Sequence, residues 1–208
     1  MAGILAGLRP PHPLRVAIDG VDAAGKTALA DELAHVLERR GRSVIRSSLD
    51  GFHNAKAIRH RRGSLSSEGY YLDSFDYRAL RQNLLDPLGP GGTLRYRTAV
   101  FDHRTDRPVD VPISRAAPDA VLLFDGIFLM RRELDDAWDY RIFVDVSPAT
   151  SLRRGVARDR DLMEPEVEER YRLRYLPAQR RYLTEADPAA RANLRIVNDD
   201  PAAPWIGE

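Results

Sequence analysis

The stretch that decides the fold is Arg15-Val16-Ala17-Ile18-Asp19-Gly20-Val21-Asp22-Ala23-Ala24-Gly25-Lys26-Thr27. Its first five residues predict a short buried strand, and the pattern from Lys26 to about Arg40 predicts a helix. Residues 20–27 match GxxxxGK[ST], a phosphate-binding loop that has to follow a strand and open a helix. The sequence on both sides of the loop therefore meets the structural condition of the motif.

The residue types of this loop suit a polyphosphate. Gly20 and Gly25 let the backbone turn its N–H groups inward, and the start of the helix adds a partial positive charge. Lys26 is expected to reach the β- and γ-phosphates of ATP, and the Thr27 hydroxyl to bind Mg²⁺. A glycine-rich turn without a ligand is the alternative, but a chance match is expected in only roughly one such chain in a thousand. The residues expected to bind the ATP phosphates are Gly20, Val21, Asp22, Ala23, Ala24, Gly25, Lys26, Thr27 and Ala28.

Four further apolar segments predict strands, at residues 44–48, 120–124, 140–146 and 194–197. Helical patterns follow several of them, and strands that alternate with helices favour a parallel sheet. We expect an α/β fold with three layers: a five-stranded, mainly parallel sheet, helices on both faces and a small lid at about residues 153–165. Residues 1–13 are expected to form a flexible arm before a single domain at 14–208.

Composition limits the kinds of partner. The 208 residues carry 32 basic and 31 acidic side chains and a net charge of +1, which favours neither nucleic acid nor an anionic membrane. No stretch approaches the roughly 20 apolar residues of a membrane span. The chain has no cysteine, so a metal would need oxygen or histidine ligands, as Mg²⁺ does. We expect a cytoplasmic protein with a small-molecule partner, and a homo-oligomer stays open.

Two acidic residues follow predicted strands. Asp125 ends the most apolar strand and is expected to help hold Mg²⁺, although an ordinary turn at Gly126 would also explain it. Asp50 follows the second strand, where the parallel-sheet rule places active-site residues, and it is the candidate base for an accepting hydroxyl. The chain lacks the Asn-Lys-x-Asp motif of GTPases and a Glu after Asp125 that would polarise water. Phosphoryl transfer is therefore favoured over hydrolysis.

Several segments resemble the group of uridine kinase, phosphoribulokinase and pantothenate kinase. They are Ser48-Leu49-Asp50-Gly51-Phe52-His53, Tyr71-Leu72-Asp73-Ser74-Phe75-Asp76, Leu123-Phe124-Asp125-Gly126-Ile127-Phe128 and Asn198-Asp199-Asp200-Pro201. The resemblance implies that Asp50 is the base, that Asp73 lies on the acceptor side, and that Asn198 and Asp200 lie near the adenine. It also implies an arginine-bearing lid, for which Arg154 and Arg158 are the candidates, because arginines that close over the γ-phosphate neutralise charge and exclude water.

The sequence departs from the uridine kinase pattern in three places. The lid is shortened to Arg158-Asp159-Arg160-Asp161, His53 stands where many members have Tyr, and Phe101-Asp102-His103 keeps an aromatic residue and an Asp at altered spacing. The acceptor residues we expect are Asp50, His53, Asp73, Phe101 and His103. The resemblance implies ATP-dependent phosphorylation of a nucleoside such as uridine or cytidine. The alternatives are a non-nucleoside alcohol (pantothenate, a sugar, glycerate or a phosphoribulose type) and a non-catalytic ATP-dependent switch.

Overall fold

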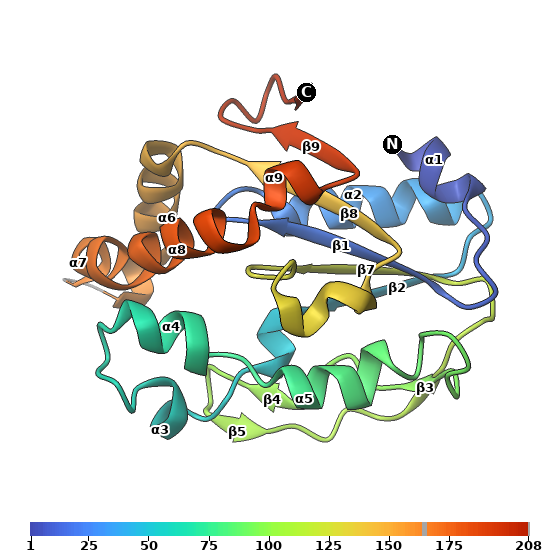
Figure 1. Cartoon of the computed structure of the whole chain (residues 1–208), viewed down its shortest axis with the longest axis horizontal. Coiled ribbons are helices and arrows are strands. Elements are labelled where there is room, and N and C mark those ends of the chain that lie inside the picture. The colour runs from blue at the N-terminus through green and yellow to red at the C-terminus, as the bar shows by residue number, and fades with distance from the viewer. Residues whose placement is uncertain (164–165, 208) are drawn as a thin grey trace.

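A computed structural model describes residues 1–163 and 166–207 (Figure 1). Its main sheet has the strand order β10-β9-β8-β1-β7-β2. The strands are β1 (Leu14–Gly20), β2 (Val44–Ser48), β7 (Val121–Gly126), β8 (Tyr140–Asp145), β9 (Leu194–Val197) and β10 (Trp205–Gly207). The five parallel strands are those predicted from the sequence, and the mainly parallel sheet is confirmed.

The expected count of five strands was one too few. β10 joins the edge of the sheet antiparallel to β9, pairing Trp205 with Val197. Trp205 and Ile206 are largely exposed, so this short edge strand has no buried pattern by which the sequence could reveal it.

Helices cover both faces of the sheet, as expected for three layers. Along β1, Val16 and Ile18 face a core shared with α2 (Lys26–Arg39), whereas Ala17 faces the other core. That second core contains Phe128 and Tyr182 and is covered by three helices and a 3₁₀ helix. These elements are α4 (Ser67–Asp73), α5 (Tyr77–Leu80), α8 (Leu176–Ala186) and the 3₁₀ helix Arg132–Ala137.

The segment before β1, expected to be a flexible arm, contains helix α1 (Ala2–Gly7). The Leu5 side chain is fully buried against α2. The Arg42 guanidinium donates hydrogen bonds to the carbonyls of Leu5, Ala6 and Leu8. In the structure this segment therefore packs on the domain.

The remaining elements lie around the sheet and complete the description of the chain. Glu208, the end of the predicted domain, and residues 164–165, the end of the predicted lid, lie outside the described residues. Within the part of the chain that is described, no helix has both the length and the apolar character needed to cross a bilayer. The remaining elements around the sheet are the 3₁₀ helix Leu49–Phe52, α3 (Lys56–Arg59), the π-helical turns Arg81–Leu85 and Tyr171–Tyr175, β3 (Arg95–Tyr96), β4 (Phe101–Asp102), β5 (Arg107–Pro108), β6 (Ser114–Arg115), α6 (Pro148–Met163), α7 (Val167–Arg170) and α9 (Pro188–Arg191).

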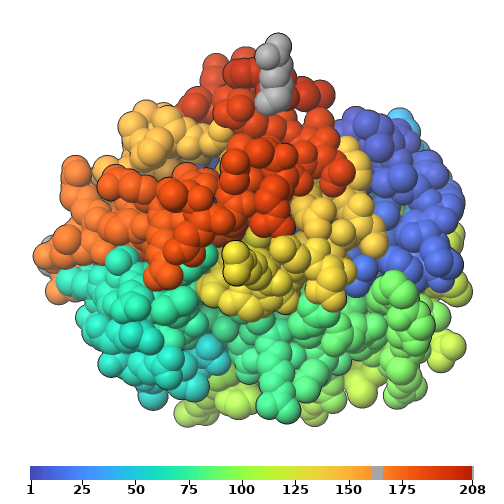
Figure 2. Space-filling model, viewed as in Figure 1, coloured from blue at the N-terminus to red at the C-terminus, as the bar shows by residue number. Residues whose placement is uncertain are grey.

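Figure 2 shows how the layers close over one another. The surface of α8 and its neighbours, orange to red, lies directly against the surface of residues 50–85, cyan to green. Contacts between α8 and α4 agree with this view. Segments from the two halves of the chain therefore pack against each other at this surface.

Candidate active site

The phosphate loop leaves β1 at Gly20 and enters α2 at Lys26. A Cβ at Gly20 would lie 2.3 Å from the Val144 carbonyl oxygen. Gly25 has a φ of +95°, and a Cβ there would lie 2.7 Å from Nδ2 of Asn198. Both glycines are thus required by the geometry of the loop, one by close approach and the other also by its left-handed backbone.

Lys26 lies among four carboxylates. Its Nζ donates a hydrogen bond to the Val21 carbonyl at 2.7 Å. Burial lowers the pKa of Lys26, and the carboxylates of Asp22, Asp19, Asp125 and Asp50 oppose that shift. All four carboxylates act on the pKa of Lys26, so they surround the one lysine of the loop.

Thr27 and Asp125 are brought together, as predicted for a metal site. The Thr27 hydroxyl donates to Oδ2 of Asp125 at 2.7 Å, and Arg46 contacts Oδ1 of the same carboxylate at 3.0 Å. Hydroxyl and carboxylate oxygens are ligands that suit Mg²⁺, which usually takes one or two protein ligands together with phosphates and water. Among the described residues no cluster of three or more His, Asp or Glu residues forms a metal cage. The pair therefore fits Mg²⁺ bound jointly with a nucleotide.

Asp50 lies on the 3₁₀ helix that directly follows β2. Ser48 caps this helix by accepting a hydrogen bond from the Asp50 N–H at 3.3 Å. The Asp50 side chain is exposed. Burial lowers the pKa of Lys26 and raises the pKa of Asp22, and the Asp50 charge opposes the first shift and adds to the second. The carboxylate is thus open to solvent and within electrostatic reach of the loop.

Two predicted acceptor residues, His53 and His103, stack with ring centroids 4.5 Å apart. Phe75 lies on His53 at 4.6 Å, and His53 is also within 3.1 Å of the Asp50 carbonyl through Nδ1. Burial lowers the pKa of His53 to about 4, so this imidazole is neutral at pH 7. Phe101, on β4, is half-buried in the strand that packs against the 3₁₀ helix of Asp50. The site next to Asp50 is therefore lined by aromatic rings, and the His53 imidazole among them is neutral.

Asp73 differs from the other predicted acceptor residues. It is buried, and its two carboxylate oxygens contact Arg61 and, at 2.9 Å, Arg62. The hydrogen bond from Arg61 lowers the pKa of Asp73. Both oxygens are occupied by arginines of the loop between α3 and α4.

The two predicted lid arginines point to different places. Arg158 binds Asp159 at 2.7 Å. Burial raises the pKa of Asp22, and the charges of Lys26 and Arg158 partly oppose that shift. Arg154 instead donates to the carbonyls of Asn198 and Asp199, both at 2.9 Å. Arg158 alone is therefore directed toward the phosphate loop.

A cavity of about 580 Å³ lies beside the loop, where a nucleotide base would extend from the phosphates. Asn198 closes one side by donating from Nδ2 to the Ala24 carbonyl at 2.7 Å. Asp200 is exposed in the following turn, where it accepts a hydrogen bond from the Ala202 N–H at 2.9 Å. The cavity is lined mainly by apolar side chains: Met1, Ala23, Gly25, Ala28, Leu29, Glu32, Val144, Arg154, Leu194, Ile196, Asn198, Pro201, Pro204, Trp205 and Ile206.

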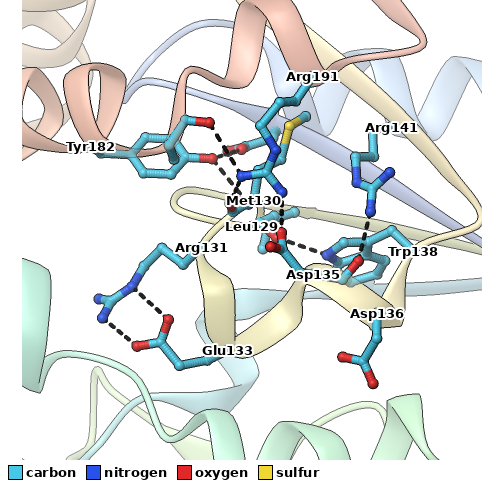
Figure 3. A network of polar contacts seen from close by, with 12 residues as sticks. Leu129, Met130, Arg131, Glu133, Asp135, Asp136, Trp138, Arg141, Tyr182 and Arg191 are labelled. Carbon is cyan, nitrogen blue, oxygen red and sulfur yellow. Dashed lines mark hydrogen bonds and ion pairs between the residues drawn. The ribbon is translucent and has the colours of Figure 1, made fainter.

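A second cavity, of about 540 Å³, contains none of the predicted site residues. Its wall includes the ion pairs of Arg131 with Glu133 and of Arg191 with Asp135 (Figure 3). Three of the four lining arginines are thus paired with lining acids, because Arg181 also binds Glu185 at 2.7 Å.

Sequence reasoning missed five residues that contact the site: Asp19, Arg46, Tyr70, Gln179 and Tyr182. Asp19 carried a signal, because an acidic residue inside a buried strand needs a partner. Burial raises its pKa to about 6, and Tyr182 donates a hydrogen bond to it. Gln179 and Tyr182 come from α8, far along the chain, and no local pattern connects them with the loop.

A strand, a phosphate loop and a helix, together with carboxylates at the ends of the neighbouring strands, are the features of a P-loop kinase fold. No family model matches the chain. The chain is 30% identical to uridine-cytidine kinase B of Dictyostelium discoideum over 149 residues, covering 71% of this chain and 59% of the relative. It is 28% identical to uridine-cytidine kinase 2-B of Danio rerio over 161 residues, with 71% and 58% covered.

The fold comparison agrees with the sequence comparison. A solved structure of a possible uridine kinase from Bacillus stearothermophilus superposes with a TM-score of 0.73 at 22% identity, covering 93% of this chain and 94% of that one. The chain spans somewhat under two thirds of the curated relatives it matches. The resemblance to uridine kinase-like P-loop kinases that the motifs indicated is confirmed.

Proposed function

We propose that the protein transfers the γ-phosphate of ATP to a hydroxyl of a small molecule, with a nucleoside such as uridine or cytidine as the leading acceptor. The observation that carries this proposal is the position of Asp50. Its exposed carboxylate is within electrostatic reach of Lys26, so a group that binds the phosphate donor and a proton acceptor lie close together. A kinase needs these two groups together, whereas a nucleotide-dependent switch needs only the first.

In this mechanism the loop N–H groups and Lys26 hold the β- and γ-phosphates. Thr27 and Asp125 would hold Mg²⁺, which supplies charge neutralisation at the phosphates when bound. Asp50 accepts the proton of the attacking hydroxyl, and Arg158 neutralises charge that spreads over the transferred group. Asn198 and the apolar cavity receive the base of the nucleotide.

A flat acceptor is supported by the surroundings of Asp50. The rings of His53, His103 and Phe75 pack together, and His53 is uncharged at neutral pH. Aromatic faces stack on planar groups such as nucleobases. The names of the two relatives point the same way. A role for Asp73 would require it to leave Arg61 and Arg62, so we assign it to positioning of the loop between α3 and α4.

The domain boundaries and the lid are also part of this proposal. Residues 14–208 would act as a single kinase domain, with α6 as the base of a lid. A cytoplasmic location stays a prediction from the sequence, and the oligomeric state stays open.

The test is a screen for ADP release with Mg²⁺ and ATP across uridine, cytidine, pantothenate, glycerate and simple sugars. We expect one alcohol to raise ADP release sharply and to appear as its phosphomonoester by mass spectrometry. A nucleoside result supports the leading acceptor, and a different alcohol supports the non-nucleoside alternative. Binding of ADP without stimulation by any alcohol would favour the switch and contradict the kinase.

A further inference from the structure

One face of α8 contacts the phosphate loop at two points. Gln179 and Tyr182 are three residues apart, so their side chains leave the same side of the helix. Both are almost completely buried, at 2% and 1% exposure. Their polar groups point to Asp22 and Asp19, which lie within the loop and directly before it.

Asp22 occupies an unusual place for a carboxylate. The loop collects N–H groups to attract an anion, and an acidic side chain within it would repel a polyphosphate at short range. The Asp22 carboxylate is held through Oδ2, which accepts hydrogen bonds from Nε2 of Gln179 at 2.7 Å and from the Tyr70 hydroxyl at 3.2 Å. Both donors come from the side of the loop where α8 and α4 lie.

Tyr182 connects the start of the loop with the turn after β7. Its hydroxyl donates to Oδ2 of Asp19 and accepts a hydrogen bond from the Met130 N–H at 3.0 Å (Figure 3). Oδ1 of Asp19 accepts from the Gly20 N–H at 2.7 Å. The same turn contains Phe128 with a φ of +63°, a left-handed conformation that a bulky residue adopts only when its surroundings impose it. Asp19 and Tyr182 therefore hold two neighbouring strand ends in one arrangement.

We propose that Gln179 is a positioning residue for the nucleotide: its hydrogen bond fixes the Asp22 carboxylate in one orientation beside Lys26, so that the acid does not turn into the phosphate site, while Tyr182 fixes the first residue of the loop through Asp19. This inference rests on the proposed function for the identity of the phosphate ligand. It makes α8, which has no residue in the loop motif, the element that sets the loop for anion binding.

The experiment uses the full chain and measures Mg²⁺–ADP binding by calorimetry. Gln179→Glu places a second carboxylate against Asp22, and we expect the Kd for ADP to rise about tenfold or more. The exchanged pair Asp22→Asn with Gln179→Glu restores an amide-to-carboxylate hydrogen bond, and we expect its Kd to return to within about threefold of the wild type. Gln179→Met removes the donor without adding charge and is expected to weaken binding by a smaller factor.

Thr184→Glu is the matched control, because Thr184 is on the exposed side of α8 and the change adds the same charge to the same helix. We expect its Kd for ADP to equal that of the wild type. Thermal unfolding of each variant checks that it folds. If Gln179→Glu alone does not fold, the Kd for ADP of the exchanged pair still tests the proposal.

The outcomes separate this inference from the proposed function. Absence of ADP binding by the wild type would remove the nucleotide site itself. Binding by the wild type together with unchanged binding by Gln179→Glu, or a loss that the exchanged pair fails to restore, would overturn only the positioning role. The positioning role would also be overturned if Asp22→Asn raised the KM for the acceptor while the Kd for ADP of both Asp22→Asn and Gln179→Glu equalled that of the wild type. That result would assign Asp22 to the acceptor.

Discussion

Asp50 and Asp19 are both acidic residues at the carboxyl ends of parallel strands, but their surroundings give them different chemistry. Asp50 is exposed on a 3₁₀ helix, whereas Asp19 is fully buried with hydrogen bonds from Tyr182 and Gly20. An exposed carboxylate near a bound phosphate can receive a proton from an arriving hydroxyl. A buried carboxylate with its oxygens occupied instead contributes to the architecture of the loop.

The role of Asp50 is tested by Asp50→Asn. The amide keeps the shape of the side chain but accepts no proton, so we expect kcat to fall by about 10²- to 10⁴-fold. The Kd for ADP is expected not to rise, because Asp50 is not part of the loop and the substitution removes a negative charge near the phosphates. Steady-state kinetics with the acceptor found in the screen and calorimetry with ADP measure the two effects. Full turnover by the variant would remove Asp50 from the mechanism.

The burial of Asp19 predicts a pH-dependent stability. Its pKa is raised by burial from 3.8 to about 6, so the native state binds this proton more tightly than the unfolded state. The stabilisation from this group is complete below the unfolded pKa and is lost as the pH rises through about 6. Asn stays neutral throughout this range. We therefore expect the stability of the wild type relative to Asp19→Asn to decrease by about 3 kcal/mol across this window.

Urea unfolding of both proteins at about pH 4.5 and about pH 7.5 samples most of this window and is expected to show about 2 kcal/mol of the decrease. Other titrating groups are common to the two proteins and cancel in the comparison. A difference in stability that is the same at both pH values would show that Asp19 has an ordinary pKa.

At the scale of elements, α6 is held against the π-helical turn that precedes α8. Tyr171, which is fully buried, donates a hydrogen bond to Asp159 at 2.8 Å, and Arg158 contacts the same Tyr hydroxyl at 3.2 Å. The contact depends on Gly155, since a Cβ there would lie 2.3 Å from the Tyr171 ring. A glycine in the interior of a helix thus allows the arginine-bearing helix to approach its neighbour closely.

Gly155→Ala is therefore expected to destabilise the protein, although alanine is the better helix former. Overpacking costs about 1–3 kcal/mol, which exceeds the roughly 1 kcal/mol gained in helix propensity. Urea unfolding measures the net change. Gly69→Ala in α4 is the matched control, because its Cβ would have ordinary contacts at 3.5 Å, and it is expected to be neutral or stabilising. Equal effects of the two substitutions would contradict the packing argument.

At the scale of the whole molecule, the cavity proposed to receive the nucleotide base is built from both ends of the chain. Met1 and the C-terminal residues Trp205 and Ile206 line it together with the start of α2. The two termini lie on the same side of the molecule (Figure 1). Trp205 is 57% exposed, whereas Trp138, the other tryptophan of the chain, is buried at 5%.

This difference makes Trp205 a reporter of nucleotide binding. We expect ADP to change the tryptophan emission of the wild type, because a base in the cavity would contact the exposed indole. Trp205→Phe should lose this change and still bind ADP in calorimetry, with an affinity reduced by no more than about tenfold. An emission change that persists in Trp205→Phe would place the base elsewhere.

The sequence by itself determined the five parallel strands, the helix after the loop, the place of Gly20–Thr27 between strand and helix, and the places of Asp50 and Asp125 at the ends of strands. These features depend on neighbours in the chain: alternating or continuous apolar residues, glycines at a turn, and acids at strand ends. Only the tertiary structure decided the pairing of β10, the packing of α1, and the separation of Arg154 from Arg158. It also brought Gln179 to Asp22 across 157 residues and Tyr182 to Asp19 across 163. Such contacts depend on how a distant helix docks on the sheet, and no local pattern of residues encodes that placement.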